Sequence, residues 1–109
     1  MITIDALKEY GANVDEGLTR CMGNEALYLK LVGTITAEPK FDKLKECIDA
    51  KDLDGAFENA HALKGVVGNL SLTPLYDPLV DITDHLRARE DMDYEPLITE
   101  ILAQRDKLS

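Results

Sequence analysis

His61, Lys64, Gly65 and Gly68 are the residues whose types and spacing are best suited to chemistry. At about 100° per residue, a helix places Lys64, Gly65 and Gly68 on the same arc as His61, at positions i+3, i+4 and i+7. An unperturbed imidazole is mostly uncharged near neutral pH and is a usable nucleophile. A lysine one turn away can offset the charge of a phosphoryl group added to the ring.

The two glycines indicate that this face is kept bare. Glycine inside a helix costs roughly 0.8 to 1 kcal/mol relative to alanine. Gly65 and Gly68 would leave a shallow platform on which the backbone of another protein can approach the imidazole. Close packing against a neighbouring helix is the alternative explanation, and one of the two glycines could simply mark the helix end.

The second histidine, His85, shares a predicted helix with several aspartates. Asp81 and His85, at positions i and i+4, could in principle ligate a metal. Two possible ligands on one exposed face make a weak site, and paired surface charges explain them adequately. We therefore predict no metal site.

The helix that carries His61 is the clearest element of the sequence. Asp52 is a good N-cap, and the apolar stripe that follows runs for about five turns, which places His61 on its flank, partly exposed. The stripe consists of Leu53, Ala56, Phe57, Ala60, Leu63, Val67 and Leu70.

Helical periodicity recurs along the rest of the chain, and no sustained alternation predicts a strand. Two short helices are expected over about residues 3–22, the first ending at Gly11, the second starting near Asn13 or Asp15 and ending at Gly23. A third follows Asn24 and is interrupted by Pro39. Four further helices are expected from their apolar faces. The third helix of the chain has Tyr28, Leu31, Val32 and Ile35 on one face, and the fourth has Phe41, Leu44 and Ile48. The helix after the one that carries His61 has Leu75, Leu79, Ile82 and Leu86, and the last helix has Leu97, Ile98, Ile101, Leu102 and Leu108.

Short connections between long helices favour antiparallel neighbours. We therefore expect an all-α fold: an up-and-down antiparallel four-helix bundle over about residues 24–108, with short additional N-terminal helices. The whole chain, residues 1–109, is expected to form a single domain.

The composition excludes several classes of function. The net charge of -9 disfavours binding to nucleic acid and to membrane surfaces. The sequence has no membrane-spanning stretch and no signal peptide, so a cytoplasmic protein is expected. We also expect a monomer. Cys21 and Cys47 match no metal spacing and are expected to be buried free thiols, with a disulfide as the minor alternative. No G-x-x-x-x-G-K-[ST] loop is present, so an autonomous kinase is not expected.

The segment AHALKGVVGNL, residues 60–70, resembles the H-x-x-K-G signature of histidine-containing phosphotransfer (HPt) domains. GLTRCMGNEALYLKLV, before the bundle, and Leu53 to Phe57 resemble other segments of this family. The resemblance implies that His61 accepts a phosphoryl group from a receiver-domain aspartate and passes it to another receiver, without enzymatic activity of its own. It implies that Lys64 stabilises the charge and that Gly65 provides clearance.

The resemblance also implies that Gly68 and Asn69 lie near the docking face, while Phe57 is expected to pack beneath the ring of His61. The partners would be receiver domains of response regulators or hybrid histidine kinases. No cofactor of the chain's own is implied, because the receiver would supply Mg²⁺. The alternative function is an interaction module of the same fold that binds a receiver or kinase without being phosphorylated.

Two residues depart from the family pattern. Ser71 stands where the family more often has glycine, which puts the turn geometry in question. Pro78 lies where the next helix usually continues, and both Thr73-Pro74 and Asp77-Pro78 could start that helix. A bent or broken first turn is therefore expected at 73–78.

Overall fold

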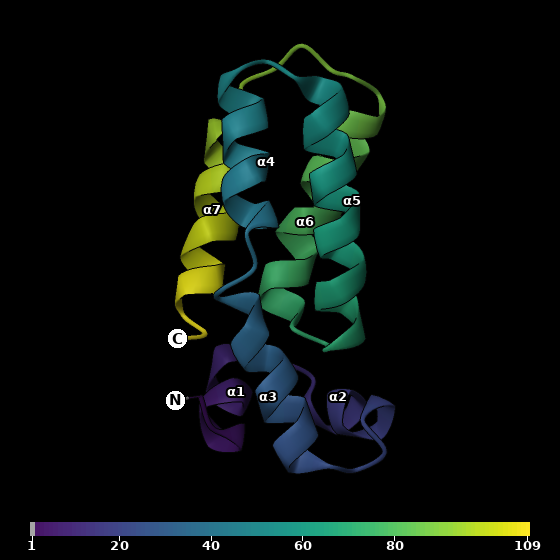
Figure 1. Cartoon of the computed structure of the whole chain (residues 1–109), viewed down its shortest axis with the longest axis vertical. Helices are drawn as coiled ribbons and strands as arrows, with labels where there is room; N and C mark the ends of the chain where they lie inside the picture. Colours follow the sequence, from purple (N-terminus) through teal and green to yellow (C-terminus); the bar gives the residue numbers. More distant parts are fainter. Residues whose placement is uncertain (1) are drawn as a thin grey trace.

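The computed structural model describes residues 2–109, and this part of the chain contains helices and turns but no strand (Figure 1). The helices are α1 (Ile4–Tyr10), α2 (Val14–Arg20), α3 (Glu25–Ile35), α4 (Lys40–Asp49), α5 (Leu53–Asn69), α6 (Thr73–Arg87) and α7 (Glu95–Asp106). The predicted all-α fold is confirmed. None of these helices is long and apolar enough to cross a membrane.

Side-chain caps explain where several helices begin. Asn13, Asn24 and Asp52 each accept a hydrogen bond from the backbone N–H three residues further on, which satisfies one of the free donors of the first turn. The start of α2 is therefore set by Asn13 and not by Asp15. The same helix ends at Arg20, earlier than the predicted Gly23.

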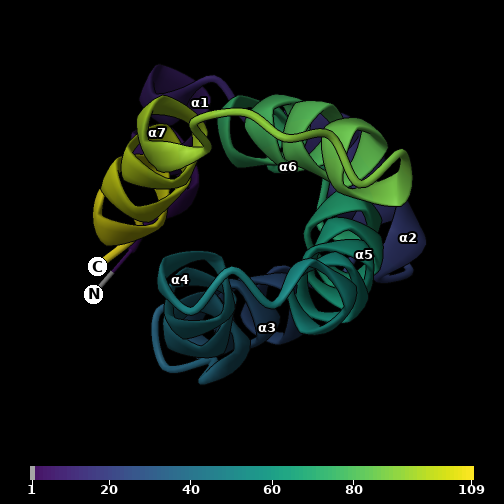
Figure 2. The ribbon, with the colours of Figure 1, turned by 90° about the horizontal axis from the view of Figure 1, so that it is seen from above.

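Helices α4, α5, α6 and α7 alternate in direction and form the four-helix bundle (Figure 1). Seen from above, α3 lies beneath α4 on the same side of the molecule (Figure 2). The two helices are separated by residues 36–39, where Pro39 interrupts the backbone pattern as predicted. Helices α1 and α2 lie with α3 at the lower end of the bundle (Figure 1).

One buried cluster joins all seven helices and includes the apolar stripe of α5. Its largest fully buried side chains include Tyr28, Phe41 and Leu63. The predicted apolar face of α3 is only partly covered, because the Leu31 side chain is 37% exposed while Tyr28 and Val32 are buried. Leu31 lies at the edge of the apolar arc of α3, and the core covers only the centre of that arc.

The prediction of a bent or broken turn at 73–78 is wrong, because α6 runs without interruption from Thr73 to Arg87. Pro74 lies in the first turn, where its missing N–H would have had no intrahelical acceptor. Pro78 removes only the bond that would reach Pro74. The buried apolar face of α6 compensates for this loss, since Leu75 and Leu79 are fully buried.

Both cysteines are free thiols. Cys21 is buried as predicted, but Cys47 is only half-buried. The expectation of a second fully buried thiol was therefore wrong. Cys47 lies in the last turn of α4, where the Asn59 amide donates to its sulfur at 3.8 Å.

Candidate functional site

His61 lies near the middle of α5 with its side chain exposed, as predicted. The direction of the ring follows from the opposite face of the helix, where Ala60, Leu63 and Val67 are fully buried. Within residues 2–109, no group hydrogen-bonds to either ring nitrogen of His61. The imidazole therefore presents both nitrogens to solvent or to a partner.

Phe57 packs against the imidazole, as predicted. The ring centroids of Phe57 and His61 are 5.7 Å apart and the ring planes differ by 17°, which is a stacked arrangement. The two residues are one helical turn apart on α5, so the helix itself brings the rings together. Phe57 is half-buried and lies below His61 on the side of the α5 N-terminus.

His85 has a different environment. Its Nε2 lies 3.2 Å from Asp81 and its Nδ1 lies 2.7 Å from Glu90, so both ring nitrogens are engaged with carboxylates. The hydrogen bond with Glu90, followed by the charges of Glu90 and Asp81, raises the pKa of the His85 imidazole. A ring whose two nitrogens are both engaged with carboxylates has no nitrogen free to act as a nucleophile.

The two glycines of the predicted platform have different surroundings. A Cβ built on Gly65 would meet nothing within 4 Å, so no neighbour in the fold requires glycine there. A Cβ on Gly68 would lie 2.9 Å from Cε1 of Tyr76 on α6. For Gly68 the alternative explanation, close packing against a neighbouring helix, is therefore the one that the structure shows.

Lys64 is half-buried and lines a cleft of about 520 Å³ between α5, α2 and the start of α6. Gly65 and Gly68 also line this cleft. Within residues 2–109, no carboxylate lies within 4.0 Å of the Lys64 ammonium. The charge of Lys64 is thus available for an incoming anionic group.

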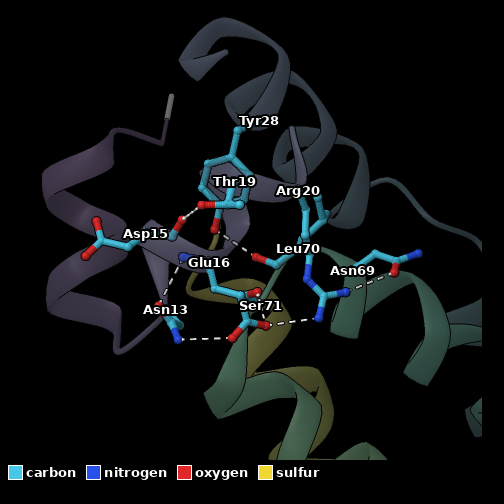
Figure 3. A network of polar contacts seen from close by, with 9 residues as sticks. All are labelled: Asn13, Asp15, Glu16, Thr19, Arg20, Tyr28, Asn69, Leu70 and Ser71. Carbon is cyan, nitrogen blue, oxygen red and sulfur yellow. Dashed lines mark hydrogen bonds and ion pairs between the residues drawn. The ribbon is translucent and has the colours of Figure 1, made fainter. Parts of the chain in front are cut away.

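Asn69 belongs to a polar network that joins α2 to the end of α5 (Figure 3). Its side-chain oxygen accepts from Arg20 at 3.4 Å, and Arg20 forms an ion pair with Glu16 at 3.1 Å. The Ser71 hydroxyl donates to the same carboxylate of Glu16 at 3.0 Å. Sequence reasoning missed the roles of Glu16 and Arg20, because their spacing to Asn69 carries no periodic signal.

Ser71 has a φ of 56°, in the left-handed region that favours glycine. Glycine would suit this position because it adopts the left-handed conformation without strain. The turn that the sequence left in question is therefore a left-handed one. Serine is held there by its bond to Glu16 and by the Asn13 N–H, which donates to the Ser71 carbonyl at 2.9 Å. The departure from the family pattern is thus accommodated by contacts from α2.

An apolar surface lies beside the exposed face of α5. Val66, which follows Gly65, is 45% exposed, and Leu27 and Leu31 on α3 are 40% and 37% exposed. Leu31 and Val66 line a small groove together with Asn69. Exposed apolar groups that adjoin one another are typical of protein contact surfaces.

Arg87 and Arg89 also approach this site and were not predicted. Their guanidinium carbons lie 5.6 Å and 5.0 Å from the centroid of the Phe57 ring. Sequence spacing could not have indicated this contact, because the fold brings the end of α6 to the start of α5.

Comparison with known proteins supports the resemblance seen in the sequence. The family model described as Hpt domain matches residues 32–109, from the middle of α3 to the C-terminus. No curated protein and no solved structure matches the chain. The matched segment contains the complete bundle and every residue of the H-x-x-K-G pattern. The chain therefore belongs to the Hpt domain family, whose members are phosphocarriers of two-component phosphorelay signalling and not enzymes.

Proposed function

We propose that His61 is the phosphoacceptor, and that it takes a phosphoryl group from the aspartate of one receiver domain and passes it to another. The observation that carries this proposal is the contrast between the two histidines. Among residues 2–109, neither ring nitrogen of His61 has a hydrogen-bond partner and the ring lies on an exposed helix face, whereas both nitrogens of His85 are engaged with carboxylates.

The chemistry needs few groups from this chain. A ring nitrogen of uncharged His61 attacks the phosphorus of the aspartyl phosphate; the P–N bond forms as the P–O bond to the aspartate breaks, and the aspartate leaves as a carboxylate. The reverse reaction loads the second receiver. The Lys64 ammonium offsets the negative charge of the phosphoryl group, and the receiver contributes Mg²⁺.

The exposed face of α5 supports docking of a receiver. Gly65 leaves space beside the imidazole, because no side chain projects from this position. Val66 and Leu31 supply adjoining apolar surface, and Asn69 supplies an exposed polar group at its edge. Adjoining apolar and polar groups of this kind are typical of protein interfaces. Gly68 contributes through the cleft that it lines with Lys64.

A relay experiment tests this function. Receiver domains of the same organism are phosphorylated with acetyl phosphate, freed of the donor and mixed with the chain, and a second receiver is then added. We expect label to move from the first receiver to the chain and on to the second receiver. The His61→Gln variant should neither accept nor pass label, whereas the His85→Gln control should do both.

The same experiment separates the carrier from the alternative interaction module. A module that only binds a receiver would form a complex with it while remaining unlabelled. Stable binding of wild-type chain to a phosphorylated receiver, with no label on the chain against any receiver tested, would contradict the carrier function.

A further inference from the structure

The orientation of the His61 ring depends on a chain of contacts that begins on another helix. Within residues 2–109, the imidazole has no hydrogen-bond partner, and the ring stacked against it is that of Phe57. Phe57 is itself half-buried, so the core alone does not fix its ring. The ring is instead approached by the guanidinium groups of Arg87 and Arg89.

Arg89 is the better anchored of these two arginines. Its Nε donates to the Asp54 carboxylate at 2.7 Å, and its Nη1 donates to the carbonyl of Leu86. Asp54, Phe57 and His61 follow one another at positions i, i+3 and i+7 of α5, so they share one face of that helix. Arg89 therefore links the first turn of α5 to the end of α6, directly over the Phe57 ring.

The backbone of Arg89 makes this side chain notable. Its φ is 52°, at the left-handed position after α6 where glycine is the usual residue. The N–H of Glu90 donates to the carbonyl of His85, which completes the helix end. Glycine would form this turn with less strain but would leave Phe57 without the closer of its two cations.

Stability alone is a weak explanation for the arrangement. The side chains of Arg89 and Asp54 are 41% and 84% exposed, and ion pairs between exposed groups contribute little to folding. An aromatic ring that contacts both a guanidinium group and the imidazole, by contrast, restricts the rotamers of the imidazole.

We propose that Phe57 and Arg89 are positioning residues for His61. Arg89, anchored by Asp54, holds the Phe57 ring, and the Phe57 ring holds the imidazole in the orientation from which its nitrogen attacks the aspartyl phosphate. This inference rests on the proposed function of His61. It assigns to the end of α6 an effect on a reaction that takes place on α5.

The chain contains a matched control for this contact. Arg105 on α7 lies over the ring of Phe41 on α4, with its guanidinium carbon 5.5 Å from the ring centroid. This pair has the same chemistry as that of Arg89 and Phe57, but neither residue lies on α5. Arg105→Gln therefore removes a comparable contact without touching the positioning chain.

The first readout is the NMR signals of the His61 ring in the free protein, which need no phosphate. Phe57→Leu keeps an apolar side chain but removes the ring, and we expect it to move the His61 signals away from their wild-type positions. Arg89→Gln should move them in the same direction by less. Phe57→Tyr keeps the stacked ring, so it and Arg105→Gln should leave the signals nearly unchanged.

The second readout is transfer from a phosphorylated receiver. The maximal rate should fall about tenfold in Phe57→Leu and about threefold in Arg89→Gln, with little change in the receiver concentration that gives half the maximal rate, because orientation affects the chemical step. Phe57→Tyr and Arg105→Gln should transfer at nearly the wild-type rate.

The outcomes distinguish this inference from the proposed function. A wild-type chain without phosphate on His61 would overturn the proposed function. A normally phosphorylated wild type, with ring signals and rates unaffected by Phe57→Leu and Arg89→Gln, would overturn the positioning role alone. An equal loss of rate in Arg105→Gln and Arg89→Gln would also overturn it, because it would indicate a general effect on the fold.

Discussion

Two regions of α5 use the same small and polar residue types for different purposes. In the part of the chain that the structure describes, a Cβ added at Gly65 would meet nothing within 4 Å, and the ring stacked on His61 is that of Phe57 from the same helix. At the end of the helix, Gly68 packs against Tyr76 and Asn69 binds Arg20 (Figure 3). The bare region is open to a partner, and the packed region joins α5 to α2 and α6.

The difference shows that one sequence pattern can combine two physical requirements. Gly65 and Gly68 are three residues apart and lie on one arc, yet only Gly68 is required by the fold. Gly65 lowers helix stability, and no close contact among the described residues requires glycine at this position. A residue that lowers stability without a packing reason is expected where function needs it, and here that function would be a bare surface for binding.

The largest expected effect separates the two glycines directly. Gly68→Leu should destabilise the protein by about 2 to 3 kcal/mol, because even the first carbon of the new side chain would overlap Tyr76. Gly65→Leu should not destabilise the protein, because leucine favours a helix over glycine and meets no neighbour at its Cβ, but it should impair transfer from a receiver. Urea unfolding measures the first effect and the receiver assay the second. If both variants were destabilised equally, the fold would require glycine at both positions.

A smaller effect is expected in the packed region at Ser71. Ser71→Ala loses the bond to Glu16 and keeps the left-handed backbone, so a loss of about 1 to 2 kcal/mol is expected. Ser71→Gly loses the same bond but relieves the backbone strain, so its stability should be close to wild type. Urea unfolding of the two variants measures the difference. If Ser71→Gly were as unstable as Ser71→Ala, strain at this turn would not matter.

In the bare region, Gly65→Ala should raise stability by up to about 1 kcal/mol, because the methyl group meets no neighbour and alanine favours the helix. Gly68→Ala serves as the control. Its methyl group would lie 2.9 Å from Tyr76, so it should not gain stability. Thermal unfolding of both variants tests this prediction, and a stabilised Gly68→Ala would show that Tyr76 moves aside readily.

The smallest effect concerns His85, whose pKa is raised mainly by its hydrogen bond with Glu90. The folded protein binds this proton more tightly than the unfolded chain, so the stabilisation is fully present below the unfolded pKa of about 6.5. It is lost as the pH rises through the folded pKa. Thermal unfolding across this range should show a weaker decline with pH in His85→Gln than in wild type. If the unfolding temperature changed with pH equally in both proteins, the interaction of His85 with Glu90 would make no contribution to stability.

The sequence predicted the elements of the bare region well, because they depend on local rules. The cap at Asp52 and the stripe through Leu63 determine both the helix and the direction in which His61 points. The stack of Phe57 on His61 follows from the spacing of one turn. These features require no knowledge of how the helices pack against one another.

Features that depend on contacts between helices could not be predicted in the same way. The partner of Gly68 is Tyr76, and their approach follows from the relative rotation of α5 and α6. The exposure of Leu31 likewise depends on how much of α3 the core covers. Pro78 was expected to disturb α6, but its apolar face keeps the helix intact.

We propose that His61, and no other residue of the chain, carries the phosphoryl group. The most direct measurement is peptide mapping of the chain by mass spectrometry under alkaline conditions, after exposure to a phosphorylated receiver. We expect phosphate on the peptide that contains His61 and none on the peptide that contains His85. Phosphate on His85, or label that persists at the wild-type level in His61→Gln, would contradict it.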